Sequence, residues 1–196
     1  MRPVWRGGSL RGAGLPENGR GKVVKIGGSL LQRPDWPAEI AALLGGLAAP
    51  PLVVIGGGAI VDGLRAIDAA HPQPAGLVHQ LAIDAMTLTA RLVAAAVGLP
   101  VGERPHECQA GMVLDVAAWL RLAEPLPPLP SGWHVTSDSL AAAVARATRR
   151  GLVLAKSVPP SGHQLDLERL ADSGWVDLHF PVAAAGLDTI EWVAPA

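Results

Sequence analysis

The sequence has 196 residues, of which 49% are hydrophobic, and 16 basic residues against 17 acidic residues give a formal net charge of −1. This length suits one domain with a sizeable core, and the charge balance lacks the basic excess typical of nucleic-acid-binding proteins. The single cysteine, Cys108, excludes an internal disulfide and a multi-cysteine metal site. Only three basic residues are lysines (Lys22, Lys25 and Lys156), which makes them candidates for positions that need a compact ammonium group.

The N-terminal residues 1–21 are rich in Gly and Arg and show no periodicity, so we predict a flexible tail before a single domain at 22–196. The basic residues of this tail are not followed by an apolar run, which argues against a secretory signal. The most apolar long stretch, 77–98, contains charged residues such as Asp84 and Arg91 and predicts an amphipathic or buried helix instead of a membrane span. We therefore expect a cytoplasmic protein with neither a membrane nor a nucleic acid as partner.

Short apolar runs alternate with helical patterns along the rest of the chain. We predict strands at 22–26, 52–55, 112–114, 134–136, 152–155 and 189–193, and helices at 36–49, 60–70, 77–97, 115–123, 139–149 and 166–172. Unbroken apolar strands that alternate with helices are typical of a parallel sheet covered on both faces. The predicted fold is an α/β three-layer αβα sandwich with a mainly parallel central sheet.

Unusual residues follow three of the predicted strands, where each strand ends. They are Gly27-Gly28-Ser29, Gly56-Gly57-Gly58 and Lys156-Ser157. Ligands of such sheets bind beyond the carboxyl ends of the strands. We therefore expect these three segments to share one edge of the sheet.

The two glycine segments have the composition of anion-binding turns. Glycines allow backbone N–H groups to approach an anion, and Lys25 places a charge beside Gly27 and Gly28. The three consecutive glycines at 56–58 favour a second turn that contacts a substrate. Ordinary close-packed turns remain the alternative for both segments. Neither segment has the spacing of a Walker loop or of a dinucleotide-binding turn.

Four further residues are candidates for the same edge of the sheet. Ser137 and Asp138 precede a predicted helix, where they fit either an ordinary helix cap or a carboxylate held among cationic groups that orients lysines or helps to hold a metal. Arg65 and His79 lie on helices and could contact a substrate, although solvation of the arginine and packing of the histidine are common roles for such residues. The six tryptophans are spread singly and predict packing roles. His106-Glu107-Cys108 is not expected to bind a metal, because adjacent side chains rarely reach one ion.

Three segments carry a family resemblance when they are taken in order along the chain. They are Val23-Val24-Lys25-Ile26-Gly27-Gly28-Ser29-Leu30, Val54-Ile55-Gly56-Gly57-Gly58 and Val135-Thr136-Ser137-Asp138-Ser139-Leu140-Ala141-Ala142. Together they resemble the amino acid kinase family, which includes the acetylglutamate, aspartate, uridylate and isopentenyl phosphate kinases. The resemblance implies a three-layer α/β fold, ATP with Mg²⁺ as phosphoryl donor, no covalent enzyme intermediate, and a homo-oligomer.

The same resemblance implies roles for individual residues. Lys25 is expected to be the catalytic lysine and Asp138 the aspartate that organises the lysines. Lys156 matches a lysine of the uridylate kinases. From the resemblance and from residue positions together, the nucleotide-binding residues are expected to be Gly27, Gly28, Ser29, Ser137, Lys156 and Ser157, and the acceptor-binding residues Gly56, Gly57, Gly58, Arg65 and His79, and no residue is expected to ligate a metal.

A narrower resemblance concerns the acceptor. The stretch Val78-His79-Gln80-Leu81-Ala82-Ile83-Asp84-Ala85-Met86, the segment Leu129-Pro130-Ser131-Gly132-Trp133 and the segment His179-Phe180-Pro181 are similar to the small kinases of methanofuran biosynthesis. Those enzymes phosphorylate [5-(aminomethyl)furan-3-yl]methyl phosphate to its diphosphate, so this is the expected reaction. Another acceptor, such as a carboxylate or a nucleoside monophosphate, is the first alternative.

One segment departs from the family pattern. Val158-Pro159-Pro160 stands where many members have Val-Asp-Gly, in the loop that shapes the nucleotide pocket. This departure keeps a second alternative open, a nucleotide- or anion-binding subunit without turnover.

Overall fold

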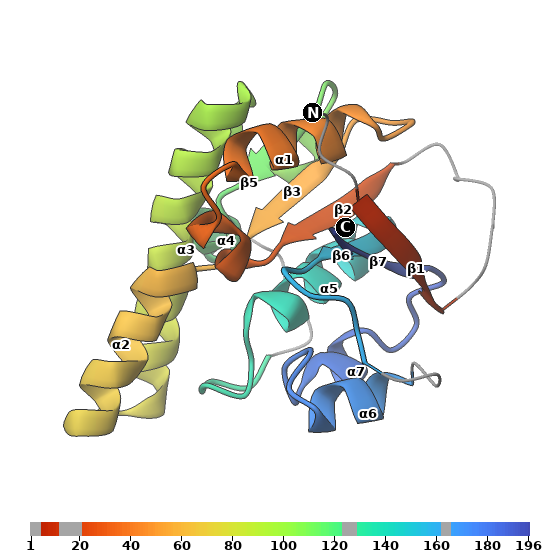
Figure 1. The fold of residues 1–196 in the computed structure, drawn as a ribbon. Helices are drawn as coiled ribbons and strands as arrows, with labels where there is room; N and C mark the ends of the chain where they lie inside the picture. Colours follow the sequence, from red (N-terminus) through yellow and green to blue (C-terminus); the bar gives the residue numbers. More distant parts are fainter. Residues whose placement is uncertain (1–4, 12–20, 123–128, 162–165) are drawn as a thin grey trace.

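The computed structural model describes residues 5–11, 21–122, 129–161 and 166–196. Within these residues, seven strands form one sheet in the order β1-β7-β6-β2-β3-β5-β4 (Figure 1). Neighbouring strands are parallel except for β1, which is antiparallel to β7. The strands are β1 (Trp5–Arg11), β2 (Lys22–Ile26), β3 (Leu52–Ile55), β4 (Val101–Gly102), β5 (Met112–Leu114), β6 (Gly151–Ala155) and β7 (Ile190–Pro195).

Helices cover both faces of this sheet, with α1 on one side and α5, α6 and α7 on the other (Figure 1). The α-helices are α1 (Trp36–Gly45), α2 (Gly58–Ala70), α3 (Ala75–Val97), α4 (Val116–Leu122), α5 (Ser137–Thr148), α6 (Leu167–Asp172) and α7 (Phe180–Ala183). Two 3₁₀ helices, η1 (Gly28–Gln32) and η2 (Pro105–Glu107), lie between them. The arrangement confirms the predicted αβα sandwich with a mainly parallel sheet.

The core is divided by the sheet because successive strand residues point to opposite faces. In β2, Val23 packs into the cluster beneath α4 to α7, whereas Val24 packs into the cluster beneath α1 and the C-terminal half of α3. Lys25 follows this alternation and shares the face of Val23. An ionisable side chain thus points from a buried strand toward α5, and it needs a partner there.

The strand register aligns the carboxyl ends of the three central strands. Ile26 of β2 is paired with Ile55 of β3 on one side and with Ala155 of β6 on the other. Because the chain continues from β2 to β3 on one side and reaches β6 on the other, β2 marks the point where the strand order reverses. Ligands of open α/β sheets bind at this point.

Several segments differ from the sequence predictions. Residues 5–11, expected within a flexible tail, form β1, because the backbone of β7 supplies hydrogen bonds to a segment that has no apolar run of its own; residues 1–4 and 12–20 lie outside the described residues. Residues 134–136, predicted as a strand, form the turn before α5. The short strand β4 and the short helices α7, η1 and η2 have no counterpart among the predictions.

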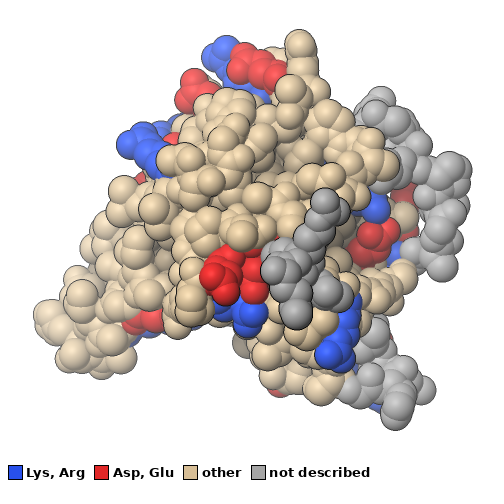
Figure 2. All heavy atoms as spheres, turned by 45° about the horizontal axis from the view of Figure 1, so that its top comes forward, with Lys and Arg blue, Asp and Glu red and all other residues tan. Residues whose placement is uncertain are grey.

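The surface carries no long field of one charge on the face drawn in Figure 2, where basic and acidic residues form small mixed groups. Among the described helices, α3 is long and apolar enough to cross a membrane, with a mean hydropathy of 1.3 over its most apolar window. In this fold α3 contacts β3, β4 and β5, and its buried residues belong to both core clusters, Ile83 to one and Val93 to the other.

Candidate active site

The carboxylate of Asp138 lies between two lysines at the carboxyl edge of the sheet. Lys25 Nζ is 2.8 Å from Asp138 Oδ1, and Lys156 Nζ is 2.7 Å from Asp138 Oδ2. Lys25 and Asp138 are both 4% exposed. Lys25 comes from β2, Asp138 from the first turn of α5, and Lys156 from the residue after β6. Three elements therefore place two positive charges on one buried negative charge.

Burial and charge compete in setting the ionisation of this cluster. Burial raises the pKa of Asp138, but the charges of Lys156 and Lys25 outweigh it and lower the pKa to about 2. Burial, together with repulsion from Lys25, lowers the pKa of Lys156 to about 8 against the attraction of Asp138. At neutral pH, Asp138 is ionised and Lys156 is mostly protonated, which leaves the cluster with excess positive charge.

The two glycine turns pack directly on each other. A Cβ atom on Gly28 would lie 2.2 Å from the Gly58 nitrogen, and one on Gly58 would lie 2.8 Å from the Gly28 carbonyl oxygen. Gly58 has a positive φ of 54°, which favours glycine. A Cβ on Gly56 would lie 2.9 Å from Ser137 Oγ, at the start of α5. The glycines are thus required for contact between the turns, so the alternative of close-packed turns applies to both segments.

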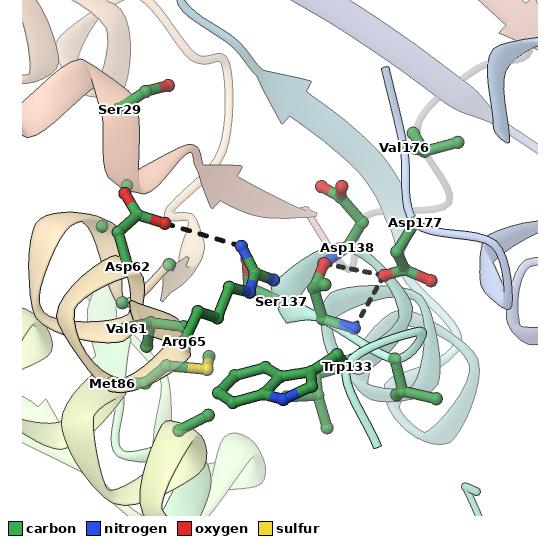
Figure 3. A pocket seen from close by; sticks show the side chains of 18 of the residues that line it. Ser29, Val61, Asp62, Arg65, Met86, Trp133, Ser137, Asp138, Val176 and Asp177 are labelled. Atoms are coloured by element: carbon green, nitrogen blue, oxygen red, sulfur yellow. Dashed lines mark hydrogen bonds and ion pairs between the residues drawn. The ribbon is translucent and has the colours of Figure 1, made fainter. Parts of the chain in front are cut away.

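A cavity of about 310 Å³ opens beside the cluster, with Lys156 and Asp138 in its wall. Its other end is formed by α2, α3 and the turn before α5, where Arg65 lies over the ring of Trp133 at 5.1 Å from the ring centre (Figure 3). Asp62 is 3.5 Å from Arg65, and the Trp133 indole N–H donates to Asp68 Oδ2 over 2.7 Å. One end of the cavity therefore carries Lys156 beside the carboxylates of Asp138 and Asp177, and the other combines an aromatic ring with charges of both signs.

The sequence itself matches no protein-family model and no curated protein. The structure is similar to uridylate kinase from Archaeoglobus fulgidus, with 16% identity, a TM-score of 0.57, and 89% of this chain and 90% of that chain covered. It is also similar to UMP kinase from Ureaplasma parvum, with 12% identity, a TM-score of 0.57, and 89% and 98% of the two chains covered. The chain has the uridylate kinase fold. At these identities the similarity concerns the fold, so the chemistry is argued below from the residues of this chain.

Within the uridylate kinase fold, the predicted site residues gather at one edge of the sheet. Those that line the cavity are Gly28, Ser29, Gly56, Gly57, Gly58, Arg65, His79, Ser137, Asp138 and Lys156. Three others lie beside it without forming its wall. Lys25 lies behind Asp138, the Gly27 N–H donates to the Ala155 carbonyl over 2.8 Å, and Ser157 Oγ accepts a hydrogen bond from Ser29 Oγ over 3.0 Å.

His79 combines a lining position with a packing contact. Its Nδ1 atom is 3.3 Å from the Gly132 carbonyl oxygen. Burial lowers the pKa of His79 despite this hydrogen bond. A mostly neutral His79 therefore donates to the turn before α5 and leaves only its second ring nitrogen for a ligand.

Sequence reasoning missed several residues of the cavity wall, and three of them contact the cluster, Arg65 or the start of α5. Trp133 and Trp175 were expected only to pack, but both line the cavity, and the Trp175 carbonyl accepts a hydrogen bond from Lys156 Nζ over 2.7 Å. Asp177 lies near the start of α5 (Figure 3). It follows a segment with no periodicity, and its partners are about forty residues away along the chain, so no local sequence pattern identified it.

Proposed function

We propose that this protein is an ATP-dependent kinase that transfers a phosphoryl group to a small acceptor with a phosphomonoester group. The observation that carries the proposal is Asp138 held between Lys25 and Lys156 beside a cavity at the carboxyl edge of a uridylate kinase fold. Phosphoryl transfer depends mainly on positioning and on neutralisation of charge. A buried cluster with excess positive charge suits this task.

The proposed reaction assigns a distinct role to each member of the cluster. An oxygen of the acceptor phosphate attacks the γ-phosphorus of ATP and forms the new P–O bond. The bond from the γ-phosphorus to the β,γ-bridging oxygen breaks, its electron pair leaves with ADP, and the acceptor becomes a diphosphate. Lys156, in the cavity wall, neutralises negative charge on the phosphoryl group while it is transferred from ATP to the acceptor. Lys25 adds charge from behind, and Asp138 holds both ammonium groups in place.

A metal ion in this cavity would take most of its ligands from the substrates. None of the His, Cys, Asp and Glu side chains of the described residues gather in groups of three or more that could hold an ion. Both Asp138 oxygens face lysines, so this carboxylate is already neutralised. Mg²⁺ in kinases is bound largely by substrate phosphates and water. We therefore propose that Mg²⁺ enters with ATP and supplies further neutralisation of the phosphates.

The far end of the cavity supports a small ring-containing acceptor. Trp133 offers an aromatic surface for a ring and Asp62 an anion for an amine, which would direct the acceptor phosphate toward Lys156, with Arg65 as a further cation along the cavity. An aminomethylfuran phosphate has all three complementary groups. Together with the sequence resemblance around His79, this favours [5-(aminomethyl)furan-3-yl]methyl phosphate as the acceptor.

The decisive experiment measures ADP release from purified protein with ATP, Mg²⁺ and one of three acceptors: the furan phosphate, UMP or acetylglutamate. We expect turnover with the furan phosphate and its loss in Lys25→Ala. Turnover that survives Lys25→Ala would contradict the role of this lysine. Preference for UMP or acetylglutamate would assign the enzyme to another acceptor.

One observation favours a second candidate, a nucleotide-binding subunit without turnover. Pro159 and Pro160 follow β6, and the Val158 carbonyl accepts a hydrogen bond from the Trp175 indole over 3.1 Å. The loop after β6 thus contacts Trp175 at the cavity wall, and it lacks the acidic residue and the glycine that many members of the amino acid kinase family have there. Calorimetry that shows ATP binding, with no ADP formed with any acceptor, would support this candidate.

A further inference from the structure

The buried carboxylate of Asp177 accepts hydrogen bonds from the start of α5. Its Oδ2 accepts from the Thr136 N–H over 2.9 Å, from Thr136 Oγ1 over 2.8 Å and from the Ser139 N–H over 3.0 Å. Its Oδ1 accepts from Ser139 Oγ and from the His179 N–H over 3.1 Å. Asp138 lies between Thr136 and Ser139 in the sequence, so the hydrogen bonds to Asp177 hold the backbone on both sides of Asp138.

These hydrogen bonds compensate for a weak cap at the N-terminus of α5. The usual helix cap is a side chain at the residue before the first turn, which accepts from an N–H two or three residues later. Here the Thr136 hydroxyl is 3.4 Å from the Asp138 nitrogen, which makes a long hydrogen bond, while its proton goes to Asp177. The orientation of the first turn of α5 therefore depends on a carboxylate from a distant part of the chain.

The segment that carries Asp177 also contacts Lys156. Two residues earlier, the Trp175 carbonyl accepts from Lys156 Nζ over 2.7 Å, and the Trp175 ring lies 5.1 Å from the same ammonium. Residues 175–177 thus contact the lysine at one end and the helix that bears Asp138 at the other. Two members of the proposed catalytic cluster are held by one short segment.

We propose that Asp177 is a positioning residue that fixes the first turn of α5 so that Asp138 stays between Lys25 and Lys156. The proposal rests on the proposed kinase function for its consequence on turnover, but the positioning itself can be measured without turnover. The groups that face Lys156 are Asp138 from α5, Lys25 from β2 and Asp177 itself. Asp177 acts on Asp138 through the backbone of α5, and the proposal gives it no contact with the substrate.

The test compares Asp177→Asn with a matched control, Asp166→Asn, in the full chain. Asp166 also caps a helix, accepting from the Arg169 N–H over 2.7 Å at the start of α6, but it is exposed and lies outside the cavity wall. The chain has only three lysines, so ¹³C-labelled lysine gives three side-chain signals that Lys→Arg variants can assign. The readouts are the titration midpoint of Lys156 by NMR, kcat, and KM for ATP.

In Asp177→Asn we expect the pKa of Lys156 to fall below its value of about 8 in the wild type. The variant removes the negative charge of residue 177 and lets the carboxylate of Asp138 move away from Lys156. We expect kcat to fall by about tenfold or more with a smaller change in KM, as displacement of a catalytic group predicts. Asp166→Asn should match the wild type in all three readouts. A folded Asp177→Asn protein with an unchanged midpoint and unchanged kcat would show that Asp177 is only a helix cap.

A second variant decides the question if Asp177→Asn does not fold. Ser139→Ala removes one donor to Asp177 and keeps its charge, and we expect a severalfold loss of kcat and an altered Lys156 signal. Unchanged kcat and signal in Ser139→Ala would overturn the proposal. If the wild type transfers no phosphate, the proposed function fails, while the Lys156 signal in Ser139→Ala, which keeps the charge of Asp177, still decides whether Asp177 positions the cluster.

Discussion

At the residue scale, the Asp138 cluster needs each charge on a single small nitrogen. Two ammonium groups meet one carboxylate at 2.8 and 2.7 Å, and an arginine would bring a planar fork of greater width into the same space. We expect Lys25→Arg and Lys156→Arg to lower kcat by about two orders of magnitude, comparable to the loss of one transition-state donor.

Lys22→Arg is the matched control for these variants. Lys22 begins β2 at the opposite edge of the sheet, where its ammonium lies 2.9 Å from Glu191 in a more exposed pair. We expect it to keep wild-type kcat in the ADP-release assay. Equal losses in all three variants would point to a general effect on folding, which thermal unfolding of each variant would reveal.

The low pKa of Lys156 predicts how activity depends on pH. Its protonated form carries the charge that attracts phosphates, and this form is lost as the pH rises through about 8. We expect kcat/KM for ATP to fall above this pH. We expect kcat to fall only at a higher pH, because bound phosphates favour the ammonium form of Lys156. A kcat/KM profile that is flat to pH 10 would contradict a role for the charge of Lys156.

At the element scale, the contact between the two glycine turns predicts the effect of a single methyl group. In Gly28→Ala the new Cβ would meet the backbone of Gly58 at 2.2 and 2.4 Å, so one turn must move. We expect a loss of about 1–3 kcal/mol in the free energy of unfolding, as for other overpacked sites, together with loss of ADP release.

Gly63→Ala provides the control for this variant. Gly63 lies within α2, and a Cβ there would meet nothing within 4 Å. Alanine is favoured over glycine within a helix, so we expect a gain of about 0.5–1 kcal/mol. Denaturant unfolding measures the change in unfolding free energy for both variants. An unchanged unfolding free energy in Gly28→Ala would show that the two turns can move apart at little cost.

How well an element could be predicted depended on where its stabilisation comes from. The strands at 22–26 and 52–55 were predicted with their observed bounds, because each is an apolar run that ends at glycine. β1 was missed because its pairing comes from β7, and 134–136 was misread because its backbone bonds to Asp177 instead of a strand. The site residues differ in the same way. Lys25, Asp138 and Lys156 could be predicted because they lie at the ends of strands or at the start of a helix. Asp177 and Trp175 could not, because their partners are distant in the sequence.

At the scale of the whole molecule, α3 leaves a row of leucines exposed. Leu77, Leu81, Leu88 and Leu92 are 48%, 41%, 56% and 56% exposed, and their spacing places them on one side of the helix. The row spans about 22 Å at the rise of an α-helix. Exposed apolar surface of this extent is typical of an interface. The expected homo-oligomer would cover it if α3 packed against α3 of a second copy about a twofold axis.

We therefore expect the protein to be a dimer at micromolar concentration and the double variant Leu88→Glu/Leu92→Glu to be a folded monomer, because paired helices would bury four like charges at the axis. Leu178→Glu is the matched control, since Leu178 is 65% exposed but lies outside α3. Sedimentation velocity measures the mass of each, and circular dichroism checks the fold. A wild-type monomer would contradict the dimer, and a monomer that sediments with lipid vesicles would assign the leucines to a membrane surface instead.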